Sequence, residues 1–184
     1  TATSTAHVQK LFRFTDTIVF SFDGDAAGRK AAWRAMVNAL SLATDTRTIK
    51  FLFLPPEHDP DTFVREKGAD ALAAEVRTAM TLSQFLLFGL NQAAPDGSAE
   101  ARARQLHLAK PMLQSLPNGA LRTHIIQALA TQLNSTPSDV AEYCELATNQ
   151  RPRKGAKEKT KRVAPPSSIE RALDLVIAHP SIAQ

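Results

Sequence analysis

Cysteine, long apolar runs and aromatic residues are all scarce in this chain of 184 residues. The single cysteine, Cys144, excludes a disulfide within the chain and a zinc site built from several cysteines. No apolar run approaches the ~20 residues that a membrane-spanning helix needs. Residues 1–7 also lack the basic start and apolar core of a signal peptide. These absences predict a cytoplasmic protein with no membrane partner.

The positive charge of the chain is concentrated in one segment. The whole chain carries a formal net charge of +4, but residues 149–166 contain seven Lys and Arg against one acid, Glu158. The rest of the chain therefore has a net charge of −2. Such a run is usually solvated and disordered, which favours a flexible basic linker. The alternative is that it follows a nucleic-acid backbone weakly and in a salt-sensitive way.

The chain is organised around a short apolar run that ends in two acids. Residues 17–22 are rich in β-branched and aromatic residues, and Asp23-Gly24-Asp25 follows directly. This pattern predicts a buried strand whose carboxyl end presents both carboxylates. A helix is predicted over residues 26–41, with Gly28 in the turn that begins it.

A second acidic turn follows a second strand. Residues 48–54 again form a short apolar run, which leads to Asp59-Pro60-Asp61. Strand, helix and strand make a βαβ unit, so the two strands should be parallel. Both acidic pairs should then emerge at the carboxyl edge of the sheet, where open α/β folds bind ligands.

Four carboxylates at one edge would repel one another without cations. Oxygen ligands favour Mg²⁺ or Mn²⁺ over zinc, and two such ions could together handle phosphate oxygens. The alternative is a pair of surface turns, because Asp-Gly is a common turn dipeptide. A calcium-binding EF-hand is excluded, since Arg34 stands where the loop needs a bidentate Glu. Arg29 and Lys30 either balance the local negative charge or hold nucleotide phosphates.

The two acidic stretches resemble a known family. The run from Phe22 to Met36, with Asp-Gly-Asp-Ala-Ala-Gly, and the run from Phe53 to Gly68, with Asp-Pro-Asp-Thr, closely resemble bacterial replicative DNA primase. The matching part is the second half of its Toprim domain, the metal-binding fold shared with topoisomerases. The two motifs at this spacing are specific, whereas Asp-x-Asp alone is weak.

The resemblance implies a function for the parent protein. It would synthesise short RNA primers on a single-stranded DNA template from nucleoside triphosphates, by two-metal nucleotidyl transfer at the replication fork. The motif match makes Asp23, Asp25, Asp59 and Asp61 the catalytic and metal-binding residues, with Arg29 and Lys30 as phosphate-binding candidates. The glutamate strand, the zinc module and the template-binding lobe of such enzymes are not recognised in this chain. We therefore expect the isolated chain to be inactive, and zinc only in the parent's N-terminal module.

The remaining chain predicts helices. Several helical patterns with short loops follow Thr81, which begins a capping box, and they imply a small helical bundle. The resemblance implies that the last helix begins the region that docks on the replicative helicase. The predicted organisation comprises the C-terminal part of a Toprim domain at 1–80, a helical bundle at 81–148, the linker at 149–166, and the first helix of the helicase-binding domain at 167–184.

The predicted fold class is therefore α/β, with half of a Toprim-type parallel sheet, flanking helices and the bundle. Two functional alternatives stay open. Another Toprim enzyme, a topoisomerase or nuclease, would share the acids, although the lone Tyr143 lies in a helical segment away from them. The second alternative is that the chain is not catalytic and serves as a partner-binding module.

Overall fold

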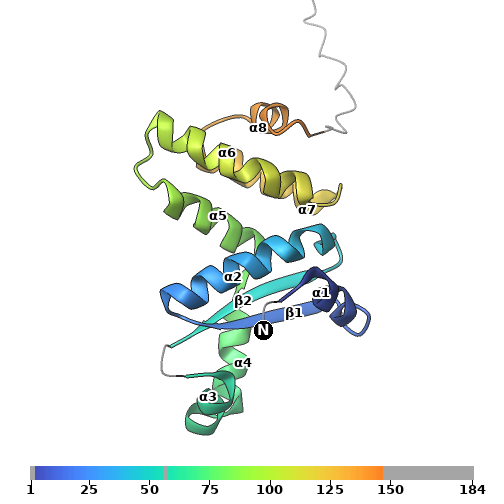
Figure 1. The fold of residues 1–184 in the computed structure, drawn as a ribbon, viewed down its shortest axis with the longest axis vertical. Coiled ribbons are helices and arrows are strands. Elements are labelled where there is room, and N and C mark those ends of the chain that lie inside the picture. Colours follow the sequence, from blue (N-terminus) through green and yellow to red (C-terminus); the bar gives the residue numbers. More distant parts are fainter. Residues whose placement is uncertain (1–2, 56–57, 147–184) are drawn as a thin grey trace, which may run out of the picture. The chain divides into compact units, whose positions relative to one another are not determined.

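The computed structural model describes residues 3–55 and 58–146 (Figure 1). Two strands and a crossover helix come first, and a run of helices follows them. The elements in chain order are α1 (Thr5–Leu11), β1 (Thr17–Asp23), α2 (Ala26–Ala39), the 3₁₀ turn η1 (Leu40–Leu42), β2 (Thr48–Leu54), α3 (Pro60–Lys67), α4 (Ala69–Thr78), β3 (Met80–Thr81), α5 (Leu82–Ala93), α6 (Ala99–Ser115), α7 (Ala120–Gln132) and α8 (Pro137–Tyr143).

The sheet is mixed and has the strand order β1-β2-β3. β1 and β2 pair in parallel from Thr17 opposite Thr48 to Asp23 opposite Leu54, which confirms the predicted βαβ unit. β3 pairs antiparallel with β2, and sequence patterning did not predict it. A strand of two residues is too short to show a period of two, and β3 runs directly into the capping box of α5.

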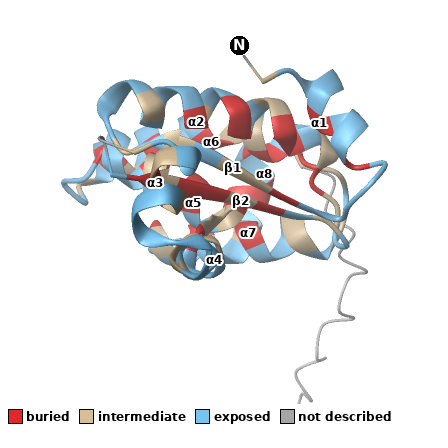
Figure 2. Ribbon diagram, turned by 90° about the horizontal axis from the view of Figure 1, so that it is seen from below, coloured by how far each residue is buried: buried red, intermediate tan, exposed pale blue. Residues whose placement is uncertain are grey.

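Alternation along the strands divides the apolar residues between the two faces of the sheet. One face belongs to the large core, to which α2 and α5 contribute; its strand residues are Ile18, Phe20, Phe22, Ile49, Phe51 and Phe53. The other face forms a smaller core with α3 and α4, in which Leu52 and Leu54 pack with Phe63. Figure 2 shows the buried strands between α2 on one side and α3 and α4 on the other. Both faces are covered, as expected for a parallel pair.

The large core continues from the sheet into the helical bundle. Leu86 and Leu90 of α5 are fully buried, as are Leu113 of α6 and Leu129 of α7. α5 therefore joins the sheet to the helices α6 to α8, which Figure 1 shows beyond it. The α/β class with flanking helices and a bundle is confirmed.

Other predictions concern segments at the chain's end and the membrane. The linker at 149–166 and the helix at 167–184 lie outside the described residues. None of the helices described here is both long and apolar enough to cross a membrane. The boundary between the first two predicted domains, at residue 80, stays a prediction.

Candidate functional site

The first acidic pair lies where β1 ends and α2 begins. Asp23 is the exposed last residue of β1, and Asp25 is the N-cap of α2. The Asp25 Oδ1 accepts a hydrogen bond of 2.6 Å from the Gly28 amide. A Cβ at Gly28 would overlap with the Asp23 carbonyl oxygen, so only glycine lets the helix begin this close to the strand. The turn thus fixes the backbone of both acids.

The second acidic pair begins α3. Asp59 is the N-cap, and its Oδ1 accepts hydrogen bonds from the Thr62 amide at 2.7 Å and from the Thr62 hydroxyl at 2.8 Å. These bonds, the backbone one foremost, lower the pKa of Asp59 from its ordinary value, so the carboxylate is ionised at neutral pH. Asp61 lies in the first turn and pairs with Arg65 across 2.8 Å on the helix surface.

A cation accompanies the first acidic turn. The Arg29 Nε donates to the Gly24 carbonyl oxygen at 3.3 Å, and its guanidinium lies 5.4 Å from the centre of the Phe53 ring. These two contacts hold Arg29 over the end of the sheet. Lys30, the next residue, is exposed.

His58 was not identified from the sequence, although it lies in the second acidic turn. Its Nε2 is 3.5 Å from the Glu66 Oε2, and its ring packs edge-on against Phe63. Its Nδ1 is buried and has no hydrogen-bond partner among the described residues. The only sequence signal was its place directly before Asp59.

The structure places both acidic pairs after the carboxyl ends of parallel strands, as predicted. It does not bring them into one tight cluster: within residues 3–55 and 58–146, no group of three or more His, Cys, Asp or Glu side chains could hold a metal ion. Asp25 and Asp59 serve as helix caps, so the turn interpretation accounts for part of their role. The donor chemistry still suits Mg²⁺, which keeps several waters and needs only one or two carboxylates.

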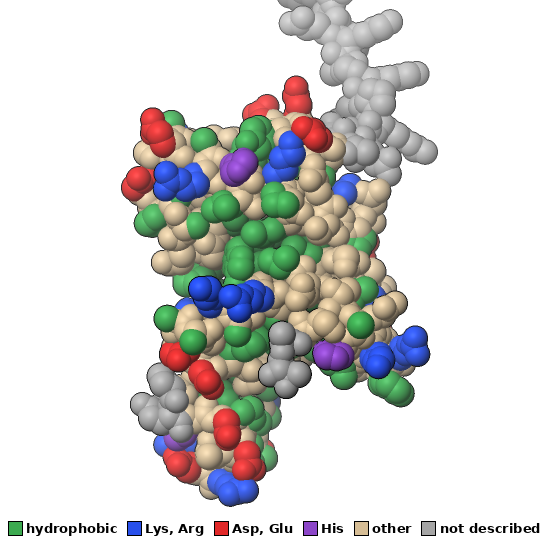
Figure 3. All heavy atoms as spheres, viewed as in Figure 1, with side chains coloured by type: hydrophobic (Ala, Val, Ile, Leu, Met, Phe, Trp, Pro, Cys, Tyr) green, Lys and Arg blue, Asp and Glu red, His purple; other side chains and the backbone are tan. Residues whose placement is uncertain are grey.

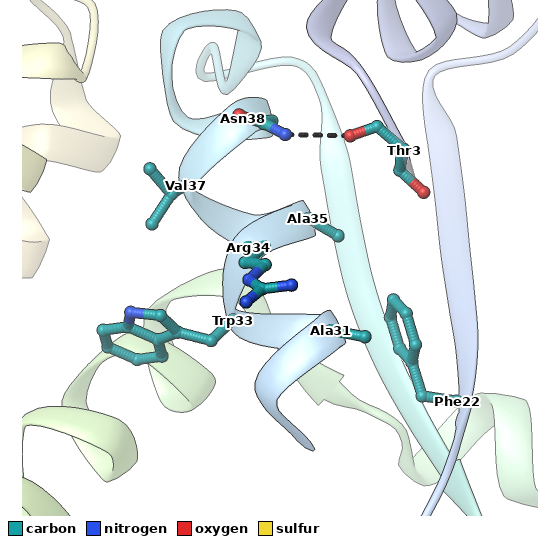
Figure 4. A pocket seen from close by; sticks show the side chains of 8 residues that line it. All are labelled: Thr3, Phe22, Ala31, Trp33, Arg34, Ala35, Val37 and Asn38. Carbon is teal, nitrogen blue, oxygen red and sulfur yellow. Dashed lines mark hydrogen bonds between the residues drawn. The ribbon is translucent and has the colours of Figure 1, made fainter. Parts of the chain in front are cut away.

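A separate cavity of about 530 Å³ lies along α2 (Figure 4). Phe22, Ala31 and Ala35 line it with Trp33 and Arg34, and the Asn38 side chain donates to the Thr3 carbonyl at 2.8 Å. Among the residues that the structure describes, no acid lines this cavity. It therefore adds nothing to the carboxylate site.

The two histidines of the bundle lie on its surface. His124 is exposed and hydrogen-bonds Gln127 at 3.2 Å, and His107 is exposed on α6. Tyr143 ends α8, which Figure 1 shows on the far side of the bundle from the strands. This tyrosine is thus remote from the acids, which argues against a topoisomerase reaction within the described part of the chain.

Comparison with known proteins gives the chain its family. Residues 90–138 match the family described as the DnaB-helicase binding domain of primase. The chain is 42% identical over 133 residues to the DNA primase of Escherichia coli K12, covering 72% of this chain and 23% of that protein. It is 38% identical over 148 residues to the DNA primase of Pseudomonas putida, covering 80% of this chain and 22% of that protein.

Solved structures agree with the sequence comparisons. A DNA primase domain from Pseudomonas aeruginosa matches with a TM-score of 0.73 and 37% identity over 79% of this chain and 46% of that one. The DnaG primase catalytic domain bound to ssDNA matches with a TM-score of 0.73 and 40% identity over 76% of this chain and 44% of that one. These structural neighbours therefore have the Toprim catalytic core that the sequence resemblance implied. The chain spans under a quarter of the curated primases it matches, and it belongs to the bacterial DNA primase family.

Proposed function

We propose that this chain is part of a primase that makes short RNA primers on single-stranded DNA, and that its strand-end carboxylates bind the metal ions of that reaction. The observation that supports this most is the placement of Asp23 at the carboxyl end of β1 and of Asp59 in the turn after β2, the parallel neighbour of β1, in a chain of the primase family. By alternation, Asp23 lies on the same face of the sheet as Leu54, the face that α3 covers.

The proposed roles follow from charge and position. Asp23, Asp25, Asp59 and Asp61 would hold Mg²⁺ or Mn²⁺, which when bound neutralises phosphate charge and activates a hydroxyl nucleophile. The carboxylates of Asp25 and Asp59 each use Oδ1 for the helix cap, which leaves Oδ2 available for a cation. Arg29, anchored to Gly24, would hold a nucleotide phosphate, with the exposed Lys30 beside it.

Metal binding tests the site directly. We would titrate Mn²⁺ into the chain by isothermal calorimetry and compare it with an Asp23→Asn/Asp59→Asn double variant. Asparagine is as good an N-cap as aspartate, so the variant should keep α3 and lose only the charge. Asp96→Asn is the matched control, because Asp96 is an exposed carboxylate that hydrogen-bonds Ser98 in the turn before α6. Loss of the Mn²⁺-binding heat in the double variant, with the heat kept in Asp96→Asn, supports the proposal. Mn²⁺-binding heat that is unchanged in the double variant would refute it.

Primer synthesis is assigned to the longer protein, since this chain corresponds to 23% of the E. coli enzyme. We expect the 184-residue chain alone to make no primer from nucleoside triphosphates, and the longer cytoplasmic protein to lose primer synthesis on Asp23→Asn. Synthesis by the isolated chain would contradict this assignment. If the chain binds no Mn²⁺ but still binds a protein partner, the non-catalytic alternative is favoured.

A contact with the replicative helicase is a second proposal. The helicase-binding family description falls on residues 90–138, which are the end of α5, α6, α7 and the start of α8. This is the bundle, and not only the terminal helix at 167–184 that the sequence suggested. Leu108 of α6 is 37% exposed and gives this surface an apolar side chain. We expect Leu108→Glu to weaken helicase capture by the longer protein, whereas Leu11→Glu, an exposed change outside this region, should not.

A further inference from the structure

A groove of about 400 Å³ lies between α2 and α5. Half of its lining residues are aromatic, and the described residues that line it are Arg29, Trp33, Phe85, Phe88, Gly89 and Gln92. Figure 3 shows hydrophobic side chains gathered above α2, with Lys and Arg side chains along the lower edge of the patch. The volume is within the usual range of small-ligand pockets, roughly 300–1,000 Å³.

The indole of Trp33 is held in place by α5. A Cβ at Gly89 would overlap with the indole ring, so the ring lies directly against the backbone of that helix. Phe85 meets it edge-on, with the ring centres 5.9 Å apart and the planes at 70°. Figure 4 shows Trp33 extending from α2 away from Phe22. Trp33 is only half-buried, and Phe88 on the facing helix is 38% exposed.

Polar groups lie with these rings in the groove lining. Arg29 precedes Trp33 by four residues, one turn of α2, and only its Nε is used in a hydrogen bond among the described residues. Lys30 and Arg34 on the same helix are exposed. Gln92 follows Phe88 by four residues on α5 and brings an amide that can donate and accept.

Aromatic faces beside a cation and an amide suit a nucleic-acid strand. A base stacks on aromatic rings, its edge hydrogen-bonds an amide, and its phosphate pairs with a guanidinium. An apolar protein segment would use the rings but would leave the anchored charge of Arg29 without a partner. Arg29 also contacts Gly24 of the acidic turn, so the groove is continuous with the proposed metal site.

We propose that this groove binds one base of a single-stranded DNA strand, stacked against Trp33 and Phe88, with a neighbouring phosphate on Arg29; the phosphate assigned to Arg29 above is then one of the DNA strand and not of a nucleoside triphosphate. The inference rests on the proposed primase function, because it places the strand beside the strand-end acids. It assigns DNA contacts to Trp33 and Phe88, to which no role beyond packing has been given above.

Tryptophan fluorescence tests the proposal, because Trp33 is the only tryptophan in the chain. We would titrate the chain with a thymidine oligonucleotide of about a dozen residues in EDTA, at low salt. Stacking should quench the emission of Trp33. Phe88→Ala should weaken binding roughly 5- to 150-fold, the usual effect of removing a stacking ring. Arg29→Ala should weaken binding and reduce the dependence of log K on log salt by about 0.7.

Phe14→Ala is the matched control, since Phe14 is an exposed phenylalanine like Phe88 but does not line the groove. It should bind the oligonucleotide like the parent. Circular dichroism would show that each variant is folded.

Three outcomes would overturn the proposal. Binding detected by anisotropy without quenching of Trp33 would place the DNA elsewhere, for instance on the basic segment 149–166. Quenching that Phe88→Ala leaves unchanged would exclude the stacking geometry. Quenching by ATP at the same concentration as the oligonucleotide would assign the groove to a mononucleotide. Because EDTA removes divalent metal, the oligonucleotide titration does not depend on the proposed metal site. A negative result in it is therefore distinguishable from a negative result in the Mn²⁺ titration.

Discussion

Asp45 caps the first turn of α7 beside Gly119, which is 74 residues further along the chain and has no side chain to do so. The Asp45 carboxylate accepts hydrogen bonds from the Ala120 amide at 3.0 Å and the Leu121 amide at 2.8 Å. A Cβ at Gly119 would lie 2.7 Å from Oδ1 of Asp45. The loop before β2 thereby supplies the N-cap that α7 lacks locally, and it joins the α/β unit to the bundle.

Replacing Gly119 should disturb this contact. We expect Gly119→Ala to push the Asp45 carboxylate away and to lower the free energy of unfolding by about 0.5–2 kcal/mol, the usual effect of losing an N-cap. The backbone of Gly119 is extended, so strain is not the cause. Urea denaturation would measure the change. Asn118→Ala, an exposed change next to it, should have little effect; an equal loss in both variants would contradict the cap.

Low pH should remove the contribution of Asp45 to the stability of the native state. Hydrogen bonds from the Leu121 amide, and then from Ala120, lower the pKa of Asp45 below its ordinary value of 3.8. A carboxyl whose pKa is lowered by folding stabilises the native state above its unfolded pKa, and the benefit is lost as the pH falls through the folded pKa. The melting temperature of Asp45→Asn should therefore lie below that of the parent at neutral pH.

The difference between Asp45→Asn and the parent should shrink once the pH falls below about 4. Asp59 and Asp96 have pKa values lowered by hydrogen bonds of the same kind, so both proteins should lose stability in acid. Comparing the two proteins at each pH isolates Asp45. A difference that does not change with pH would show that its charge is not involved.

Adding a methyl group at Gly28 should disturb the candidate site through packing. Its Cβ would overlap with the Asp23 carbonyl, so the first turn of α2 would have to move away from β1. We expect Gly28→Ala to lower the free energy of unfolding by about 1–3 kcal/mol, as overpacking does, and to weaken Mn²⁺ binding. Ala27→Gly, an exposed neighbour in the same turn, should cost about 0.5–1 kcal/mol through chain entropy alone. Mn²⁺ calorimetry should show no loss in this control.

Gln105 is a buried polar link between three helices. Its Nε2 donates to the Ala94 carbonyl at 2.6 Å, and its Oε1 accepts from the Gln132 Nε2 at 2.9 Å. Gln105→Leu would leave the Ala94 carbonyl without its donor and would remove one of the two hydrogen bonds that the Gln132 amide donates, the other going to the Leu87 carbonyl, so we expect a loss of about 1–3 kcal/mol in the free energy of unfolding. Thermal unfolding of Gln105→Leu beside Gln9→Leu, an exposed control, would measure it. A Gln105→Leu/Gln132→Leu double variant that recovers part of the loss would confirm the pairing.

Much of the fold could be predicted because its signals are local. The two apolar runs that become β1 and β2 end at the predicted residues or within one of them. The Thr81 capping box begins α5 as predicted, because an N-cap is formed by residues three positions apart. Local patterns also predicted that the acids emerge at the carboxyl edge of the sheet. Motif resemblance then indicated the family, which the comparisons confirmed.

Other features depend on segments that meet only after folding. β3 exists because residues 80 and 81 reach the edge of β2, and the cap of α7 exists because the Asp45 loop lies beside Gly119. Neither leaves a periodic signal, since its partners are far apart in the chain.

The sequence alone determined which residues carry charge and apolar surface, and hence which segments form strands, helices and acidic turns. Tertiary structure decided how those residues are used. The Arg29 guanidinium lies over the Phe53 ring because folding brings α2 beside β2, two segments that are distant in the chain. Trp33 came to line a groove because Gly89, on another helix, left room for its ring. Local sequence determines which secondary-structure element forms, but only the packing of elements against one another determines what a side chain contacts.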